Sequence, residues 1–149
     1  MKSSTSVEID RPIAEVFEYT TNNVAEWSRT VVSDEVIEEK NGGGVGTIFK
    51  VVTEENGRPM EFHGIVTEYD PPTRSVVHLK GSMFEIDAAY DFESLDYQRT
   101  RVTQHSTVTG KGFLKIVFSL FGWLMVKAGA KAQEAELVNL KRMLEAGEA

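Results

Sequence analysis

The side chains that could transfer protons to a bound substrate are first of all the three histidines, His63, His78 and His105. Histidine often serves as a general acid or base near neutral pH. The three lie on separate predicted strands and form no His-x-x-x-His pair, so their spacing does not predict a metal site. Strand alternation places all three on the outer face of a sheet. We therefore expect surface or charge-paired roles for them, and neither a metal nor a cofactor.

Tyr90 is the ionisable residue best placed to face the interior, with Gln104 and Ser106 as its expected hydrogen-bond partners. A phenol with an ordinary pKa near 10 is a donor at neutral pH rather than a base. The alternative is a core tyrosine whose hydroxyl is simply satisfied by a neighbour. No carboxylate is predicted to face inward, since Glu68 falls at a strand end beside two prolines. Tyr90 is thus the best catalytic candidate, and the lack of a second acid–base group favours binding over catalysis.

The composition excludes several classes of function. The chain has 149 residues, which fits one domain over 1–149, and a formal net charge of −7, which disfavours nucleic acid as a partner. It has no cysteine, which excludes disulfides and thiol nucleophiles. The start shows no apolar segment typical of a secretory signal. The most apolar run, 113–126, is shorter than the roughly 20 residues that span a bilayer. We expect a soluble cytoplasmic protein.

A long helix over 112–145 is the element that must organise the rest. The segment contains no proline, and Leu137, Leu140 and Leu144 recur at i, i+3 and i+7, which indicates one helical face. A helix of this length spans about 50 Å, at about 1.5 Å per residue. It therefore needs a large partner surface, and a curved antiparallel sheet wrapped around it provides one.

The preceding chain reads as strands with two short helices near the start. Strand 3–9 is followed by a helix with Asp10 as its N-cap, a second helix that carries Trp27, and strand 31–38. The glycine-rich segment 41–46 lacks the Gly-Lys-Ser/Thr of a phosphate loop, so it predicts a hairpin turn, which could also form a mobile lip over a cavity. Five further strands are predicted between 47 and 109.

Alternation assigns the faces of these strands. Opposite charges then suggest the register of strand 85–93 on its successor, since cross-strand charge pairs are favourable. The predicted pairs are Glu93 with Arg99, Asp91 with Arg101 and Asp87 with His105. The inner face would place Phe92, Tyr90, Ala88 and Ile86 opposite Thr100, Val102, Gln104 and Ser106.

The inner face has two features that are unusual for a solid core. Gly64 and Ala88 should leave space among larger side chains. Thr100, Gln104 and Ser106 bring polar groups inward, where an unpartnered group costs about 1–3 kcal/mol. Space and a few polar groups on an apolar wall are typical of a small-molecule cavity. An ordinary core with buried water is the alternative.

The order and spacing of short segments resemble a known superfamily. These segments are 7–17, Trp27, 44–47, 66–72, 100–103 and 140–145. They resemble the START-like superfamily, also called SRPBCC, and most of all its bacterial polyketide cyclase/dehydrase and lipid-transport-like branch. The resemblance implies the α+β helix-grip fold, a curved antiparallel sheet of about seven strands around a long C-terminal helix, with two short helices after the first strand.

The resemblance also implies a cavity between the concave face of the sheet and the C-terminal helix. Phe17 and Trp27 would cover one end, and the glycine turn 42–46 would lie at an opening. Combined with the inward-facing positions, this predicts a ligand-binding set of Phe17, Trp27, Phe49, Val51, Phe62, Gly64, Val66, Val77, Leu79, Ile86, Ala88, Tyr90, Phe92, Val102, Gln104 and Ser106.

Three hypotheses on function follow. Proteins similar to this one bind lipids, polyketides, quinones or plant hormones, so the first is binding or transport of a hydrophobic small molecule such as a lipid, polyketide or isoprenoid. The second is an aromatase/cyclase- or dehydratase-type enzyme with Tyr90 as proton donor. The third is a protein-interaction module that uses the apolar surface of 113–126. Burial, including a homodimer contact, is the favoured role of that stretch, with ligand or peripheral membrane contact less favoured.

Overall fold

The computed structural model describes residues 2–55 and 57–147, except for the side chains of 118 and 121–128. Strands and helices follow one another in the predicted order, which confirms the α+β class. The elements are β1 (Lys2–Ile9), α1 (Ile13–Asn22), α2 (Val24–Trp27), β2 (Val31–Glu38), η1 (Asn41–Gly43), β3 (Ile48–Glu55), β4 (Arg58–Asp70), β5 (Arg74–Lys80), β6 (Phe84–Asp96), β7 (Arg99–Gly110) and α3 (Phe113–Ala146).

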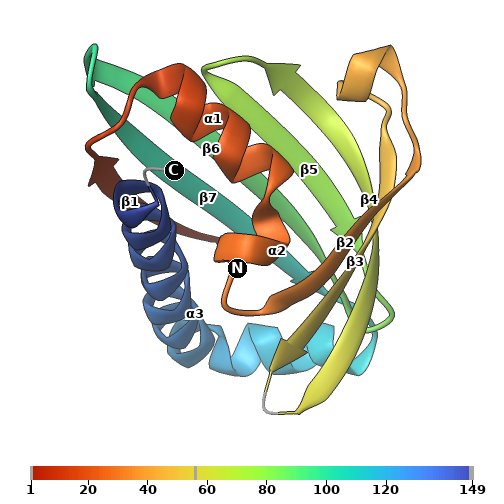
Figure 1. Cartoon of the computed structure of the whole chain (residues 1–149). Helices are drawn as coiled ribbons and strands as arrows, with labels where there is room; N and C mark the ends of the chain where they lie inside the picture. Colours follow the sequence, from red (N-terminus) through yellow and green to blue (C-terminus); the bar gives the residue numbers. More distant parts are fainter. Residues whose placement is uncertain (1, 56, 148–149) are drawn as a thin grey trace.

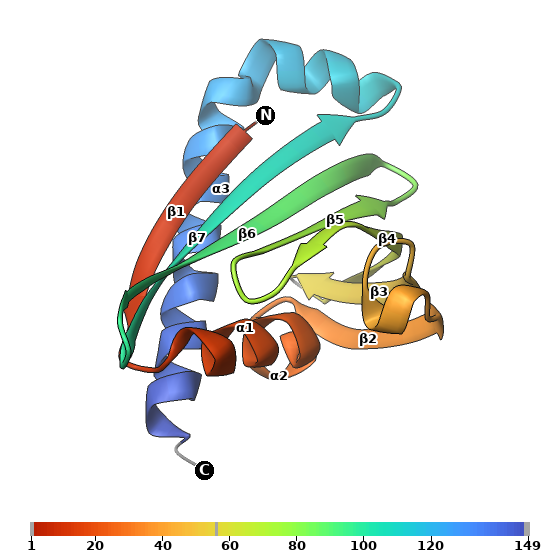
Figure 2. The same cartoon turned by 90° about the horizontal axis from the view of Figure 1, so that it is seen from above.

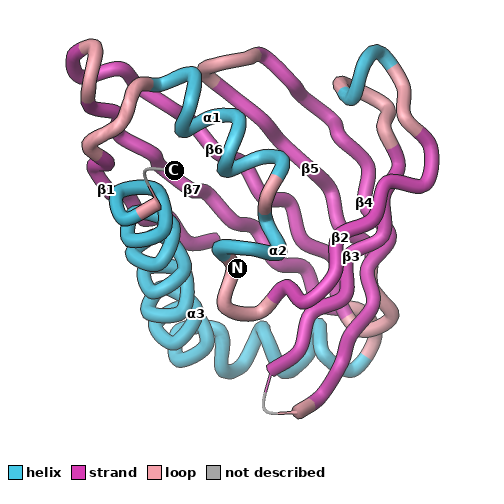
Figure 3. The backbone as a smooth tube through the Cα atoms, in the orientation of Figure 1, coloured by secondary structure: helices cyan, strands magenta, loops and turns pink. Residues whose placement is uncertain are grey.

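The strands form one seven-stranded antiparallel sheet in the order β1-β7-β6-β5-β4-β3-β2. The first strand lies beside the last, so the two ends of the strand sequence meet at one edge. Figures 1 and 2 show the sheet curving around α3, whose light-blue N-terminal part runs in a different direction from its dark-blue C-terminal part. Figure 3 shows α1 and α2 on the same side of the sheet as α3. This is the helix-grip fold that the sequence predicts.

The C-terminal part of α3 packs into the larger of two hydrophobic clusters. Leu137, Leu140 and Leu144 are 1%, 0% and 5% exposed, which confirms the predicted face. This first core cluster consists of Ile9, Val16, Phe17, Trp27, Phe92, Val102, Leu137, Leu140 and Leu144. It joins β1, both short helices and the adjacent ends of β6 and β7 to α3. Burial of these side chains therefore holds the helix against the sheet.

The start of α1 differs from the sequence prediction. Pro12, not Asp10, occupies the N-cap position, and no side chain caps the helix. The backbone N–H of Asp10 instead donates to Glu145 Oε2 at 2.9 Å, and the Arg11 guanidinium donates to the carbonyl of Glu145 at 2.8 Å. A tertiary contact with the end of α3 thus takes the place of the predicted local cap.

A second core cluster lies at the other side of the sheet. Phe49, Val51, Phe62 and Val66 form it, and pairing of Phe49 with Gly64 and of Val51 with Phe62 confirms the predicted common face. The expectation that Gly64 leaves open space is wrong. A Cβ at Gly64 would lie 2.4 Å from the ring of Phe49, so that ring already fills the space above the glycine.

The predicted register of β6 on β7 is wrong by two residues. Glu93 pairs with Arg101, and Tyr90 pairs with Gln104. The hairpin turn falls at 97–98, and a bulge between Ser94 and Asp96 shifts the ladder. Because a shift of two residues keeps every side chain on its face, the inward assignment of Ile86, Ala88, Tyr90 and Phe92 still holds. The charge pairs were misassigned, since Asp91 faces Thr103 and Asp87 faces Thr107.

The glycine-rich segment 41–46 connects β2 to β3, as the predicted hairpin turn requires. Gly42, Gly43 and Gly46 have φ values of 66°, 90° and 95°, in the left-handed region that glycine adopts readily. The backbone N–H of Gly46 donates to the carbonyl of Val66 at 2.9 Å. The turn is therefore joined to β4, and its role as a lip over a cavity stays a prediction.

Candidate functional site

The inward-facing side chains of the middle strands lie between the two core clusters. The residues on either side of them, which belong to the two clusters, are buried: Phe92, Val102 and Phe62 are 4%, 0% and 1% exposed. A filled core would bury the positions between them to the same degree. Ala88 is buried among them, but the other positions are half-buried, and they are Val77, Leu79, Ile86, Tyr90, Gln104 and Ser106. Solvent therefore reaches this part of the concave face.

The residues of the predicted ligand-binding set thus fall into three groups. Phe17, Trp27, Phe92 and Val102 belong to the first core cluster, and Phe49, Val51, Phe62 and Val66 form the second. Gly64 and Ala88 are also buried. The six half-buried residues form the third group, which we call the open concave face. Only this group combines an inward orientation with access for another molecule, while ligand contact by any of the set stays a prediction.

Phe17 and Trp27 contact aromatic side chains of β6 at the first-cluster end of the open concave face. The ring of Phe17 lies 5.1 Å from that of Phe92, and the ring of Trp27 lies 6.3 Å from that of Tyr90, both edge to face. Trp27 Nε1 donates to the carbonyl of Thr20 at 3.2 Å, which fixes the indole. The edge of the concave face is therefore built from rigid aromatic contacts.

Hydrogen bonds from α3 hold the end of α2, which carries Trp27, and the loop that follows it. The hydroxyl of Ser28 and the backbone N–H of Arg29 donate to the two carboxylate oxygens of Glu136, each at 2.5 Å. Asn139 Nδ2 donates to the carbonyl of Trp27 at 2.5 Å. Charge-assisted bonds such as those to Glu136 are among the stronger protein hydrogen bonds. The helix therefore positions Trp27 as well as covering the sheet.

Tyr90 and Gln104 form a polar patch on the open concave face. They are cross-strand neighbours, and Gln104 Nε2 donates to the hydroxyl of Tyr90 at 2.7 Å. Burial raises the pKa of Tyr90, the negative charge of Glu136 raises it further, and the bond from Gln104 lowers it. The phenol therefore stays protonated at neutral pH, and its oxygen accepts the hydrogen bond from Gln104, so a donor role for its proton stays a prediction.

Gln133 belongs to this patch and was missed by the sequence analysis. Its side chain is 7% exposed, and its Nε2 donates to the backbone carbonyl of Gln104 at 3.0 Å. Its Oε1 is buried and has no hydrogen-bond partner. The spacing of residues in the sequence could have identified it, because Gln133 lies four residues before Leu137 and is therefore a polar residue on the buried face of the helix.

The other polar groups predicted to face inward have different roles. The hydroxyl of Thr100 is satisfied within the fold, because it donates to the carbonyl of Arg11 at 2.9 Å. Thr100 is 0% exposed and therefore supports the first core cluster rather than the open face. Ser106 is half-buried opposite Ala88. The polar groups of the open concave face are thus those of Tyr90, Gln104 and Ser106, and the buried amide of Gln133 lies beside them.

The histidines lie outside this site, as predicted. The side chains of His63, His78 and His105 are 70%, 30% and 51% exposed. His78 Nδ1 lies 2.8 Å from Asp87 Oδ1, and His78 Nε2 lies 2.8 Å from Glu85 Oε1. Only the imidazolium donates from both nitrogens. The hydrogen bond to Asp87, followed by that to Glu85, therefore raises the pKa of His78.

The hydrogen bonds of His78 to Asp87 and Glu85 predict a pH-dependent contribution to stability. Because its pKa is higher in the folded than in the unfolded state, the contribution is fully present below about pH 6.5 and disappears as the pH rises through the folded value. We expect about 1 kcal/mol or less, since the pair lies near the surface. Urea unfolding of wild type and His78→Gln should therefore differ more at low pH than at high pH.

The matched control for this prediction is His63→Gln on the neighbouring strand. His63 lies 3.4 Å from Glu61, but its side chain is 70% exposed. This variant should change the free energy of unfolding by about 0.5 kcal/mol or less. A wild-type advantage over His78→Gln that is constant with pH would contradict the role of the imidazolium.

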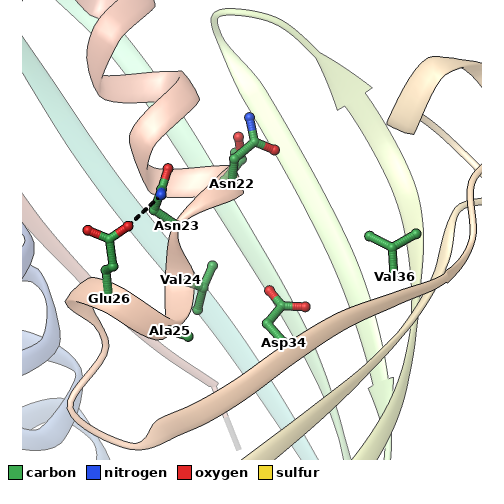
Figure 4. A pocket seen from close by; sticks show the side chains of 8 residues that line it. Asn22, Asn23, Val24, Ala25, Glu26, Asp34 and Val36 are labelled. Atoms are coloured by element: carbon green, nitrogen blue, oxygen red, sulfur yellow. Dashed lines mark hydrogen bonds between the residues drawn. The ribbon is translucent and has the colours of Figure 1, made fainter.

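Two hollows lie on the surface away from the open concave face. One, of about 260 Å³, lies between the α1–α2 junction and β2, and Asn22, Glu26 and Asp34 border it (Figure 4). Its walls displace part of the hydration of the Asp34 carboxyl, which raises the pKa of that group. The other, of about 550 Å³, surrounds the β5–β6 turn. Neither is lined by a residue of the predicted ligand-binding set.

The apolar stretch 113–126 is described only in part. Phe113, Ile116 and Leu120 are 76%, 59% and 65% exposed, and their spacing of i, i+3 and i+7 puts them on one helical face. Phe121 and Trp123, which belong to the stretch considered for a protein contact, lie outside the described side chains. Among the described residues, no helix has the length and apolar character needed to cross a membrane.

One known protein family matches nearly the whole chain. Residues 1–145 match the family described as "Polyketide cyclase / dehydrase and lipid transport". No curated protein sequence matches the chain. The family match agrees with the resemblance noted from the sequence segments.

Solved structures with the same fold come from several bacteria. The Thermus thermophilus protein TTHA0849 is 18% identical over 100% of both chains, with a TM-score of 0.80. The Zhui aromatase/cyclase from Streptomyces sp. R1128 is 14% identical over 100% of this chain and 99% of its own, with a TM-score of 0.75. A START superfamily protein from Mycobacterium smegmatis is 17% identical over 93% of this chain and 98% of its own, with a TM-score of 0.69.

At identities this low, the structural similarity shows that these proteins share a fold, and it carries no information on the ligand or on a reaction. The family match covers far more than half of the chain, and the helix-grip architecture of its structural neighbours agrees with it. The chain therefore belongs to the polyketide cyclase/dehydrase and lipid transport family.

Proposed function

We propose that the protein binds a hydrophobic small molecule, such as a lipid, polyketide or isoprenoid, on the open concave face between β5–β7 and α3. The observation that supports this most directly is the incomplete burial of inward-facing apolar residues between two buried clusters. Apolar surface that stays wet in the free protein would be buried by a ligand, at about 25 cal/mol per Å².

The pattern of polarity also supports binding. Val77, Leu79 and Ile86 provide an apolar wall, while Tyr90 and Gln104 provide a small polar patch. Ligand sites are typically apolar, with a few polar groups that fix orientation. The family description includes lipid transport, which agrees with a binding role.

Mass spectrometry of an organic extract, together with the native mass of the intact protein, tests this proposal. We expect a reproducible hydrophobic compound in stoichiometric amount. Ser106→Phe should fill the open concave face and reduce the bound fraction at least about tenfold, or roughly 1.4 kcal/mol. Thr107→Phe, at the next position on the outer face, should leave it unchanged.

An empty wild-type protein that also takes up no neutral apolar dye would contradict the proposal. Equal loss of ligand in Ser106→Phe and Thr107→Phe would also contradict it, because the two substitutions place the same ring on opposite faces of the strand. Circular dichroism of both variants checks that the fold is retained.

A second candidate is an aromatase/cyclase- or dehydratase-type enzyme on the same face. The observation that favours it is the protonated hydroxyl of Tyr90, which could donate to a carbonyl or a leaving hydroxyl. One of the structural neighbours is itself an aromatase/cyclase. Tyr90→Phe separates the candidates, since it should weaken binding by no more than about tenfold if the protein is a carrier and abolish turnover if it is an enzyme.

A further inference from the structure

The amide of Gln133 is buried in an orientation that its neighbours determine. Its Nε2 donates to the backbone carbonyl of Gln104 at 3.0 Å. A carbonyl oxygen only accepts hydrogen bonds, so a flipped amide would bring two acceptors together. Oε1 must therefore point away from Gln104, and in that position it is buried without a partner. Buried acceptors are rarely left in this state in native proteins.

The hydroxyl of Tyr90 has a proton that is available for a hydrogen bond. It accepts a hydrogen bond from Gln104 Nε2 at 2.7 Å. No hydrogen bond in the described part of the chain uses its own proton. A tyrosine hydroxyl both donates and accepts. One donor therefore remains on Tyr90, and one acceptor remains on Gln133.

These two unused groups both lie beside Gln104, which is a residue of the open concave face. Gln104 contacts both, through its side chain to Tyr90 and through its main chain to Gln133. Glu136, one turn after Gln133 on α3, is also close enough for its charge to act on Tyr90. The donor and the acceptor are thus presented by residues that converge on Gln104, from the sheet and from the helix.

The charge of Glu136 limits what the two groups can bind. Its carboxylate is held in place by Ser28 and Arg29, so it stays beside the patch. A second negative charge brought into a half-buried site near it would be repelled, and a carboxylate has no proton to donate to Gln133. A fatty-acid anion therefore fits the patch poorly.

We propose that the ligand carries a neutral hydroxyl group, which accepts a hydrogen bond from Tyr90 and donates one to Oε1 of Gln133. This inference rests on the proposed function and narrows the ligand to a hydrophobic alcohol or phenol. A hydroxyl uses both unsatisfied groups at once, whereas an ether can accept from Tyr90 but offers nothing to Gln133.

Matched probes test the inference. Binding of dodecanol, its methyl ether and dodecanoate is measured by displacement of the neutral dye Nile red. Wild type should bind the alcohol about tenfold more tightly than the ether, the usual value of one hydrogen bond, and dodecanoate more weakly than the alcohol. Gln133→Met should abolish the difference between alcohol and ether. Tyr90→Phe should weaken both about tenfold, because both accept from Tyr90.

The outcomes separate this inference from the proposed function. Equal binding of alcohol and ether to wild type would overturn the inference and leave the binding function standing, and this comparison needs no variant to fold. A preference that persists in Gln133→Met would overturn the assignment to Gln133. Failure of all three probes to displace the dye would overturn both. Gln98→Met, at an exposed glutamine in the β6–β7 turn, is the control and should behave as wild type.

Discussion

Replacing Leu140 with alanine should lower the free energy of unfolding by about 2–5 kcal/mol. Leu140 is 0% exposed and lies in the first core cluster, where α3 meets β1, β6 and β7. The substitution removes buried carbon atoms and leaves a cavity that tightly packed neighbours cannot fill completely. Urea unfolding followed by far-ultraviolet circular dichroism measures the loss.

Val138→Ala is the matched control for Leu140→Ala on the same helix. Val138 is 53% exposed, so its replacement should change the free energy of unfolding by about 0.5 kcal/mol or less. A similar loss in the two variants would mean that α3 is not docked through its leucine face. That result would also remove the support that α3 gives to Trp27 and to the open concave face.

Gly64→Ala should be the second most damaging change, at about 1–3 kcal/mol or more. The added Cβ would lie 2.4 Å from Cε2 and Cζ of Phe49, a distance at which the ring or the strand must move. Gly64 lies on β4 directly opposite Phe49 on β3, so the ring cannot move without opening the second core cluster. Urea unfolding of Gly64→Ala measures this loss as well.

Phe49→Leu provides the test of this mechanism. A smaller side chain makes room for the new Cβ, so the double variant should be less destabilised than the sum of the single variants, with a coupling of about 0.5–3 kcal/mol. Gly129→Ala is the control, because its Cβ would meet nothing within 4 Å and glycine is a poor helix former. It should stabilise the protein slightly. Strict additivity at positions 49 and 64 would refute the contact.

The faces of the strands could be predicted because side-chain direction is a local property. Each residue points away from its predecessor, so the inward positions of β3 to β7 follow from alternation alone. The buried face of α3 follows in the same way from the spacing of Leu137, Leu140 and Leu144. The order of elements then sufficed to identify the fold.

The register of β6 on β7 could not be obtained in this way. Charge complementarity predicts Glu93 opposite Arg99. A bulge after Ser94 and a turn at 97–98 instead place Glu93 opposite Arg101. Nη1 of Arg101 lies 2.8 Å from Oε1 of Glu93. Cross-strand charge pairs contribute only tenths of a kcal/mol to about 1 kcal/mol, so the geometry of the turn outweighed them.

Local periodicity in the sequence was enough to predict the face of each strand and the leucine face of α3, and the resemblance of the ordered segments to a known superfamily identified the fold. Which inward residues became core and which stayed half-exposed depended on how the elements pack. Packing closed the expected space at Gly64 with a ring from β3, and it brought Gln133 of α3 to Gln104 of β7, 29 residues apart. A residue's remaining space and hydrogen-bonding capacity depend on its neighbours in space, and these are known only once the helix is docked on the sheet.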